Sequence, residues 1–486
     1  MNNKPMSLSS NLKWVALSKF IQITLQLISL TVLTHLLAPS EYGLMAMATV
    51  VTNFTLIVRD LGTAAAIIQR KELDQTIKST VFWLNMIMGT SIALIVVLGS
   101  PFIAHLFNET ALVPVLLWLA LSFPIASLGT AQQALLERES HFKKVANIEI
   151  FASAMALLLA LLMAYQGFGV YSLVGQTLLN CCLSTLFLWR STHWRPSCIF
   201  AKEQLLQLLS FSGNLTTFNL INYFSRNADA MIIGHYFAAA VLGAYSLAYR
   251  VMLFPLQSLT FVVSRSLYPL MSRKKEDVTE VKAMYIKVLT LIASITAPMM
   301  AGLVVMREPF VAIVFGEKWT LVPSILLWLA PTGFIQSIVS TTGSVFMAND
   351  KTHLLMRLGI FSAILQVGAF VIGAQFNVQT LAMLYCIANL INALPALYFT
   401  MQTLSGSLKE LKECLIAPMV SAAIMLVALF MVMHNKLIYM DASYPGTFAG
   451  YIVFGALIYI LSYRLLFSQS LNKLLSRKLA KLLYLS

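Results

Sequence analysis

The chain has 486 residues, of which 59% are hydrophobic and only 11% are charged. Soluble proteins carry roughly 25% charged residues, so this composition excludes a soluble multidomain protein and indicates an integral membrane protein. The net charge of +14 is no sign of a nucleic-acid partner, because the basic residues lie between apolar runs, where they orient membrane spans.

Apolar runs of about 20 residues, the length that crosses a bilayer as a helix, recur along the whole chain. We expect an all-α membrane protein with about fourteen spans and short connections. The predicted spans cover residues 14–37, 42–68, 79–107, 112–136, 145–165, 169–190, 208–235, 240–264, 284–306, 321–347, 354–375, 378–402, 414–434 and 446–467. The first run is too long for the core of a signal peptide.

Lysine and arginine residues are concentrated in alternate connections. With the N-terminus inside, only Arg307, Lys318 and Lys436 fall in external segments. Positive charge is retained on the cytoplasmic side of membrane proteins, so both termini are predicted to be cytoplasmic. The five cysteines show no metal-ligand spacing, and we expect free thiols, no metal and no cofactor.

The chain also repeats itself. The string Leu-Leu-Trp-Leu-Ala occurs at 116–120 and again at 326–330, and a Pro-Phe pair precedes each copy, at 101–102 and 309–310. A second match, at an offset of 200 residues, links His35, Ala38 and Gly43 to His235, Ala238 and Gly243.

An even number of spans per copy makes this a parallel repeat, in which two lobes surround a central cavity and alternate its access. We therefore predict an N-terminal lobe at residues 1–202 (spans one to six) and a C-terminal lobe at 203–408 (spans seven to twelve). Residues 409–486 add two spans and a cytoplasmic tail. Leucines alternate with lysine and arginine at helical spacing in this tail, which predicts an amphipathic helix on anionic lipid.

Three strings resemble a known family: Thr31–Leu33 with Gly43-Leu44, then Ile68–Glu72, then Val314–Trp319. They are similar to the colanic-acid and O-antigen exporters (Wzx type) of the multidrug/oligosaccharidyl-lipid/polysaccharide exporter superfamily. The resemblance covers essentially the whole chain. It implies a bacterial inner-membrane flippase, not an enzyme, that carries undecaprenyl-pyrophosphate-linked oligosaccharide through a cationic cavity for surface polysaccharide assembly. Other polysaccharide assembly proteins are further partners that it suggests.

Charged residues inside the predicted spans are the candidate substrate site, since charge in a membrane usually faces a wet interior. The candidates for binding pyrophosphate are Lys19, Arg59, Arg226 and Arg250. Asp60 and Asp229 stand close to two of these in sequence, either as structural charge partners or as ligands of a coupling ion. Arginine grips phosphate oxygens through two parallel hydrogen bonds, which favours the substrate role.

Two polar stripes, each on one helical face, occupy matching places in the repeat. The first comprises Lys19, Gln22, Gln26 and Ser29, and the second Asn219, Asn222, Arg226 and Asp229. Both are predicted to line the central cavity, and hydrogen bonding between helices is the alternative.

Two other functions remain open. A multidrug antiporter of organic cations has the same fold, but it would favour a net acidic interior. A membrane glycan polymerase or ligase would need catalytic groups on a sizeable external loop, and the predicted external loops are short.

Overall fold

The computed structural model describes residues 8–60, 74–199, 223, 227–257, 261–274, 277–434 and 444–467. Every regular element within these ranges is a helix, which confirms the all-α prediction. The chain divides into two compact units, Met1–Gly243 and Ala244–Ser486. The predicted lobe boundary at residue 202 and the amphipathic tail lie outside the described residues, so both remain predictions.

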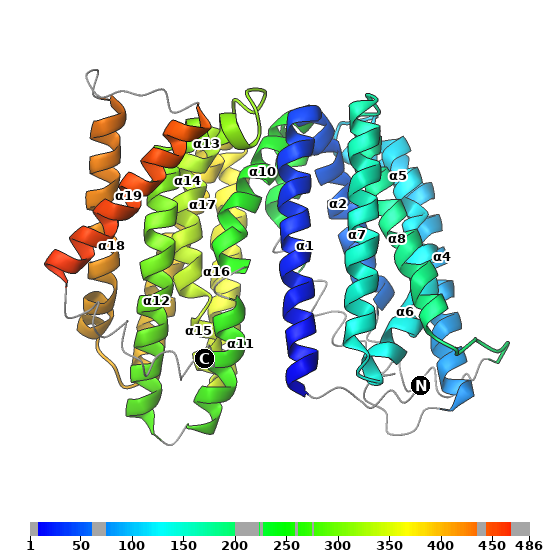
Figure 1. Cartoon of the computed structure of the whole chain (residues 1–486), viewed down its shortest axis with the longest axis horizontal. Coiled ribbons are helices and arrows are strands. Elements are labelled where there is room, and N and C mark those ends of the chain that lie inside the picture. The colour runs from blue at the N-terminus through cyan, green and yellow to red at the C-terminus, as the bar shows by residue number, and fades with distance from the viewer. Residues whose placement is uncertain are drawn as a thin grey trace. The chain divides into compact units, whose positions relative to one another are not determined.

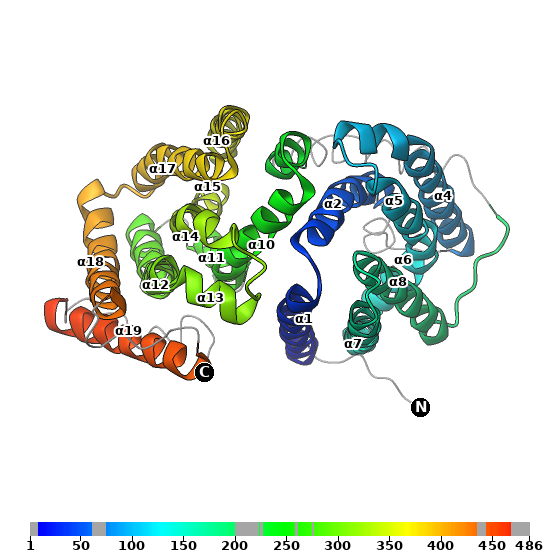
Figure 2. The same cartoon turned by 90° about the horizontal axis from the view of Figure 1, so that it is seen from above.

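Seven of the named helices and the start of an eighth lie in the described part of the N-terminal unit (Figure 1). They are α1 (Leu8–Leu36), α2 (Pro39–Asp60), α4 (Gln75–Leu106), α5 (Leu112–Ala120), α6 (Ser122–Arg138), α7 (Phe142–Tyr165), α8 (Tyr171–Ser191) and the first residues of α10 (Ala239–Pro255). Helix α7 packs against α1 on one side and α8 on the other, and α6 lies against α8 and α4 (Figure 2).

The described part of the C-terminal unit contains the rest of α10 and nine further named helices. They are α11 (Phe261–Arg273), α12 (Val278–Val305), α13 (Arg307–Val314), α14 (Val322–Val339), α15 (Thr342–Ala348), α16 (Thr352–Gly373), α17 (Val378–Thr403), α18 (Leu408–His434) and α19 (Pro445–Leu466). Helix α12 packs against α14 and α18, and α17 packs against α14 and α16. The two appended helices α18 and α19 lie side by side (Figure 2).

Ten segments of the described chain are helical, long and apolar enough to cross a membrane. Two of them join consecutive helices, α5 with α6 and α14 with α15. Apolar stretches of α1 and α10, at Phe20–Leu36 and Ala239–Pro255, are shorter. The predicted span 208–235 falls mostly outside the described residues, so the total of fourteen remains a prediction.

The starts of three helices are fixed by side chains that accept hydrogen bonds from otherwise unpaired backbone amides. Asp74 caps α4 by accepting from Ile77 N at 2.8 Å. Asn377 caps α17 by accepting from Thr380 N at 2.8 Å, and Asp277 caps α12 by accepting from Glu280 N at 2.9 Å. Each of these polar caps marks the residue at which its helix begins.

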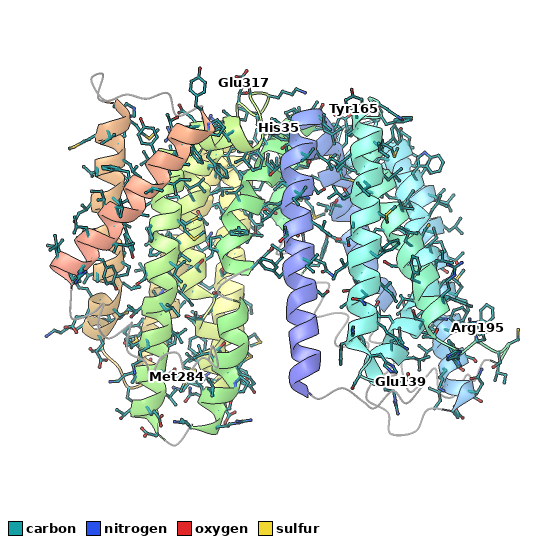
Figure 3. All side chains as sticks on the ribbon, in the orientation of Figure 1. His35, Glu139, Tyr165, Arg195, Met284 and Glu317 are labelled. Atoms are coloured by element: carbon teal, nitrogen blue, oxygen red, sulfur yellow. The ribbon has the colours of Figure 1, made fainter. Side chains whose placement is uncertain are left out.

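Within the N-terminal unit, His35 and Tyr165 lie at one end, and Glu139 and Arg195 lie at the other (Figure 3). The loop after α8 is bound to the start of α4, since Gln75 Nε2 donates to Arg195 O at 2.8 Å. The basic connections predicted to be cytoplasmic around residues 78 and 195 therefore share one end of this unit.

The C-terminal unit shows the same grouping. Lys282, near the start of α12, forms an ion pair with Glu410, near the start of α18, at 2.9 Å. Met284 lies toward that end of the unit, and Glu317 lies at the opposite end (Figure 3). The predicted cytoplasmic segments around 273–287 and 409–412 are thus neighbours.

The duplicated string has the same burial in both copies. Leu116, Leu119 and Ala120 of α5 are at most 1% exposed, and so are their counterparts in α14, Leu326, Leu329 and Ala330. The repeat seen in the sequence is therefore a repeat of core positions, each within its own unit.

Candidate functional site

The polar residues of α1 contact helices of their own unit. Gln22 Nε2 donates to Glu149 Oε2 of α7 at 2.8 Å and lies 3.3 Å from Ser18 Oγ. Ser29 Oγ accepts from Gln176 Nε2 of α8 at 3.2 Å. Gln26, between them in the predicted stripe, is exposed. The structure therefore directs Gln22 and Ser29 toward α7 and α8.

A pocket of about 280 Å³ opens beside Gln22, between α1, α6, α7 and α8. Its polar lining comprises three carboxamides, two hydroxyls and one carboxylate, which are Gln22, Gln133, Asn180, Ser153, Ser184 and Glu149. Val145, Ile148 and Leu188 supply an apolar wall. All nine residues belong to the N-terminal unit, and the arrangement of the four helices around this space can be followed in Figure 2.

Glu149 is the residue that sequence reasoning missed. It lies inside the predicted span 145–165, about 10 Å along α7 from Phe142 at 1.5 Å per residue. A carboxylate in a span is expensive and normally marks a functional interior. The signal for it in the sequence is a single acidic residue inside the predicted span 145–165.

The other predicted site residues are only partly described. The side chains of Lys19, Arg59 and Asp60 and all of Asn219, Asn222 and Arg226 lie outside the described parts of the structure. Arg250 is exposed on α10. Asp229 is only 6% exposed, and one of its carboxylate oxygens accepts from Ala230 N at 2.7 Å. A cationic cavity formed by these residues remains a prediction.

The C-terminal unit has a polar cluster of its own between α14 and α17. Gln336 Nε2 donates to Tyr385 Oη at 2.7 Å and to Asn389 Oδ1 at 3.1 Å, and Asn389 Nδ2 donates to Tyr385 O at 2.8 Å. These groups satisfy one another across a tightly packed pair of helices. Their arrangement is typical of polar contacts that hold membrane helices together.

The described residues contain no cluster of three or more histidine, cysteine, aspartate or glutamate side chains able to hold a metal ion. All five cysteines are free thiols. The polar groups that line the pocket beside Gln22 are hydrogen-bond donors and acceptors.

The described segments that are long and apolar enough to cross a membrane define a polytopic membrane protein. Within this class, a family model described as "Polysaccharide biosynthesis protein" matches residues 32–323. That is more than half of the chain, and the chain belongs to this family. The resemblance to polysaccharide exporters found in the sequence is thereby confirmed.

Curated relatives match over much of their length. Lipopolysaccharide biosynthesis protein WzxC of Escherichia coli K12 is 29% identical over 75% of this chain and 75% of its own. Teichuronic acid biosynthesis protein TuaB of Bacillus subtilis is 27% identical over 96% of this chain and 97% of its own. Succinoglycan biosynthesis transport protein ExoT of Rhizobium meliloti is 26% identical over 97% of this chain and 96% of its own.

Two solved structures have a similar fold. The lipid II flippase MurJ in an inward closed conformation superposes with a TM-score of 0.75 at 15% identity, covering 93% of this chain and 98% of MurJ. An inward-facing multidrug resistance MATE family transporter of the MOP superfamily gives a TM-score of 0.59 at 15% identity, over 79% of this chain and 94% of the transporter. The chain therefore has the fold of these transporters.

Proposed function

We propose that this protein flips undecaprenyl-pyrophosphate-linked oligosaccharide repeat units from the cytoplasmic to the periplasmic leaflet for surface polysaccharide assembly. The observation that carries this proposal is family membership together with near full-length similarity to TuaB and ExoT, which are named for polysaccharide biosynthesis and transport. The fold shared with MurJ adds support, because that protein is named as a lipid II flippase.

The proposed substrate gives different roles to the basic and the acidic residues of the predicted spans. A pyrophosphate headgroup needs positive charge, which the proposal assigns to Lys19, Arg59, Arg226 and Arg250, since guanidinium groups bind phosphate oxygens in pairs. Asp60 and Asp229 are proposed to balance these charges or to hold a coupling ion. Alternating access lets the charged headgroup cross without meeting the hydrocarbon.

The proposal also fixes location and orientation. The protein would lie in the bacterial cytoplasmic membrane with both termini inside, because the basic connections are retained on that side. Loading of substrate would then begin at the end of the N-terminal unit that carries Glu139 and Arg195 (Figure 3).

The decisive experiment is deletion of the gene followed by analysis of membrane lipids. We expect an undecaprenyl-pyrophosphate oligosaccharide to accumulate, protected in intact spheroplasts from an impermeant glycan-degrading enzyme. Restoring the gene should remove the accumulation. If no lipid-linked glycan accumulates but cells become sensitive to organic cations, the multidrug antiporter becomes the better account.

A further inference from the structure

The pocket in the N-terminal unit is chemically unlike a phosphate site. Among the described residues, its lining contains one carboxylate, Glu149, and no lysine or arginine. A pyrophosphate brought against Glu149 would meet like charge, which destabilises binding. The Glu149 carboxylate therefore disfavours the headgroup of the proposed substrate at this point of the pocket.

The pocket is also poorly matched to a bare cation. Its volume of about 280 Å³ far exceeds the roughly 30 Å³ that a single water occupies. Cation sites gather several oxygen ligands within about 2.6 Å of one point, usually with more than one carboxylate. The volume is instead close to the lower end of small-molecule pockets, which begin at about 300 Å³.

The lining offers both donors and acceptors for hydroxyl groups. Carboxamides of Gln22, Gln133 and Asn180 can donate and accept, and the hydroxyls of Ser153 and Ser184 can do both. The Glu149 carboxylate accepts strongly, and Gln22 Nε2 already donates to it at 2.8 Å. A molecule with several neighbouring hydroxyl groups satisfies this set in a way that an apolar or singly polar molecule cannot.

The apolar wall completes the match. Val145, Ile148 and Leu188 are buried and present hydrocarbon to one side of the pocket. A sugar ring has hydroxyls at its rim and C–H groups on its faces, so it needs both kinds of surface. The polar groups of the pocket come from four helices, α1, α6, α7 and α8. The packing of these helices fixes the spacing of the polar groups.

We propose that this pocket is a subsite for one neutral sugar residue, in which Glu149 accepts hydrogen bonds from ring hydroxyls and Gln22 orients the carboxylate. Identifying the occupant as part of the transported glycan rests on the proposed function. The pocket would thus bind one sugar residue of the repeat unit, at a place separate from the site that binds the pyrophosphate.

The test uses a reporter thiol in the pocket. The five native cysteines are replaced by serine or alanine, and Ser153→Cys is introduced on α7. The purified full-length protein in lipid nanodiscs is treated with a small hydrophilic thiol reagent, with and without free neutral hexoses and N-acetylhexosamines. We expect at least one sugar to slow labelling in a saturable way.

Variants then assign the contacts. Glu149→Gln keeps the shape of the side chain but removes its charge. We expect half-maximal protection of this variant to require a sugar concentration at least about tenfold higher, because one hydrogen bond to a charged group is lost. Asn180→Ala should act in the same direction. Thr177→Ala on α8 is the matched control, because its hydroxyl donates to Leu173 O of its own helix outside the pocket.

The outcomes are separable. Protection by sodium chloride but not by choline chloride or any sugar would overturn the proposal in favour of a cation site. Absence of protection by every sugar, in a protein whose reporter reacts and whose fold is intact by thermal unfolding, would also overturn it. Sugar protection without accumulation of lipid-linked glycan in the deletion strain would leave the pocket standing and refute the proposed function instead.

Discussion

Gly43 and Gly243, 200 residues apart in sequence, meet where α2 crosses α10 inside the N-terminal unit. A Cβ added to Gly243 would lie 2.9 Å from the backbone nitrogen of Gly43 and would also meet Pro39. A Cβ added to Gly43 would meet Ala239. The contact is reciprocal, since each glycine faces the residue four positions before the other, as expected when two copies of one element pack through small residues.

Replacing either glycine by leucine should therefore destabilise the protein. Gly43→Leu and Gly243→Leu each force the two backbones apart, and overpacking of this kind costs about 1–3 kcal/mol. Thermal unfolding in detergent measures the effect. Gly359→Leu on α16 is the control, because nothing lies within 4 Å of a Cβ at that glycine. Equal stability of all three variants would show that the crossing is not close-packed.

The orientation of the chain is tested by two single cysteines in a cysteine-free background. Lys409→Cys lies beside the Lys282–Glu410 ion pair, and Glu317→Cys lies at the opposite end of the same unit (Figure 3). In intact spheroplasts an impermeant thiol reagent should label Glu317→Cys only. Labelling of Lys409→Cys from outside would contradict the predicted cytoplasmic location of this segment.

The proposed phosphate-binding arginines are tested one at a time. Alanine at Arg59, Arg226 or Arg250 should abolish glycan export while the protein still accumulates in the membrane. Lysine should restore export in part at best, because a point charge lacks the planar fork of the guanidinium group. If the alanine variants instead fail to accumulate in the membrane, the arginines would be better explained as structural partners of Asp60 and Asp229 in ion pairs.

The stripe on α1 is tested by comparing neighbours of similar exposure. Gln26 and Leu27 are both exposed in the structure, Leu27 by 42%. Thiolates react in water and not in hydrocarbon, so Gln26→Cys should be labelled faster by a hydrophilic reagent than Leu27→Cys if Gln26 faces a wet cavity. Adding lipid-linked substrate should slow that labelling. Equal rates for the two positions would mean that Gln26 has no aqueous path.

Much of the fold was predictable because hydrophobic length and alternating positive charge act locally. Helix breaks were harder. The run at 112–136 is predicted as one span, and the structure has one span-length segment there, Leu112–Arg138, whose helix is interrupted at Leu121. Pro124 lacks the amide that would pair with the carbonyl of Ala120, which accounts for the break.

The site was predictable only in part. The helical spacing of the polar residues places Gln22 and Ser29 on one face of α1, but it does not reveal which neighbouring helix that face contacts. The partners Glu149 and Gln176 lie more than a hundred residues away and are brought to α1 by the packing of α7 against α1 and of α8 against α7. Polar stripes therefore indicate a wet or hydrogen-bonded face, and only tertiary structure decides between its possible partners.

The most direct measurement of the central claim is translocation in proteoliposomes of purified protein. An undecaprenyl-pyrophosphate oligosaccharide is placed in both leaflets, and an impermeant glycosidase is added outside. The account predicts that wild-type protein moves the inner-leaflet pool to the enzyme, whereas Arg226→Ala leaves about half of the lipid protected, as in protein-free liposomes. Equal protection with and without wild-type protein, from vesicles that still expel an organic cation, would contradict a lipid-linked oligosaccharide flippase.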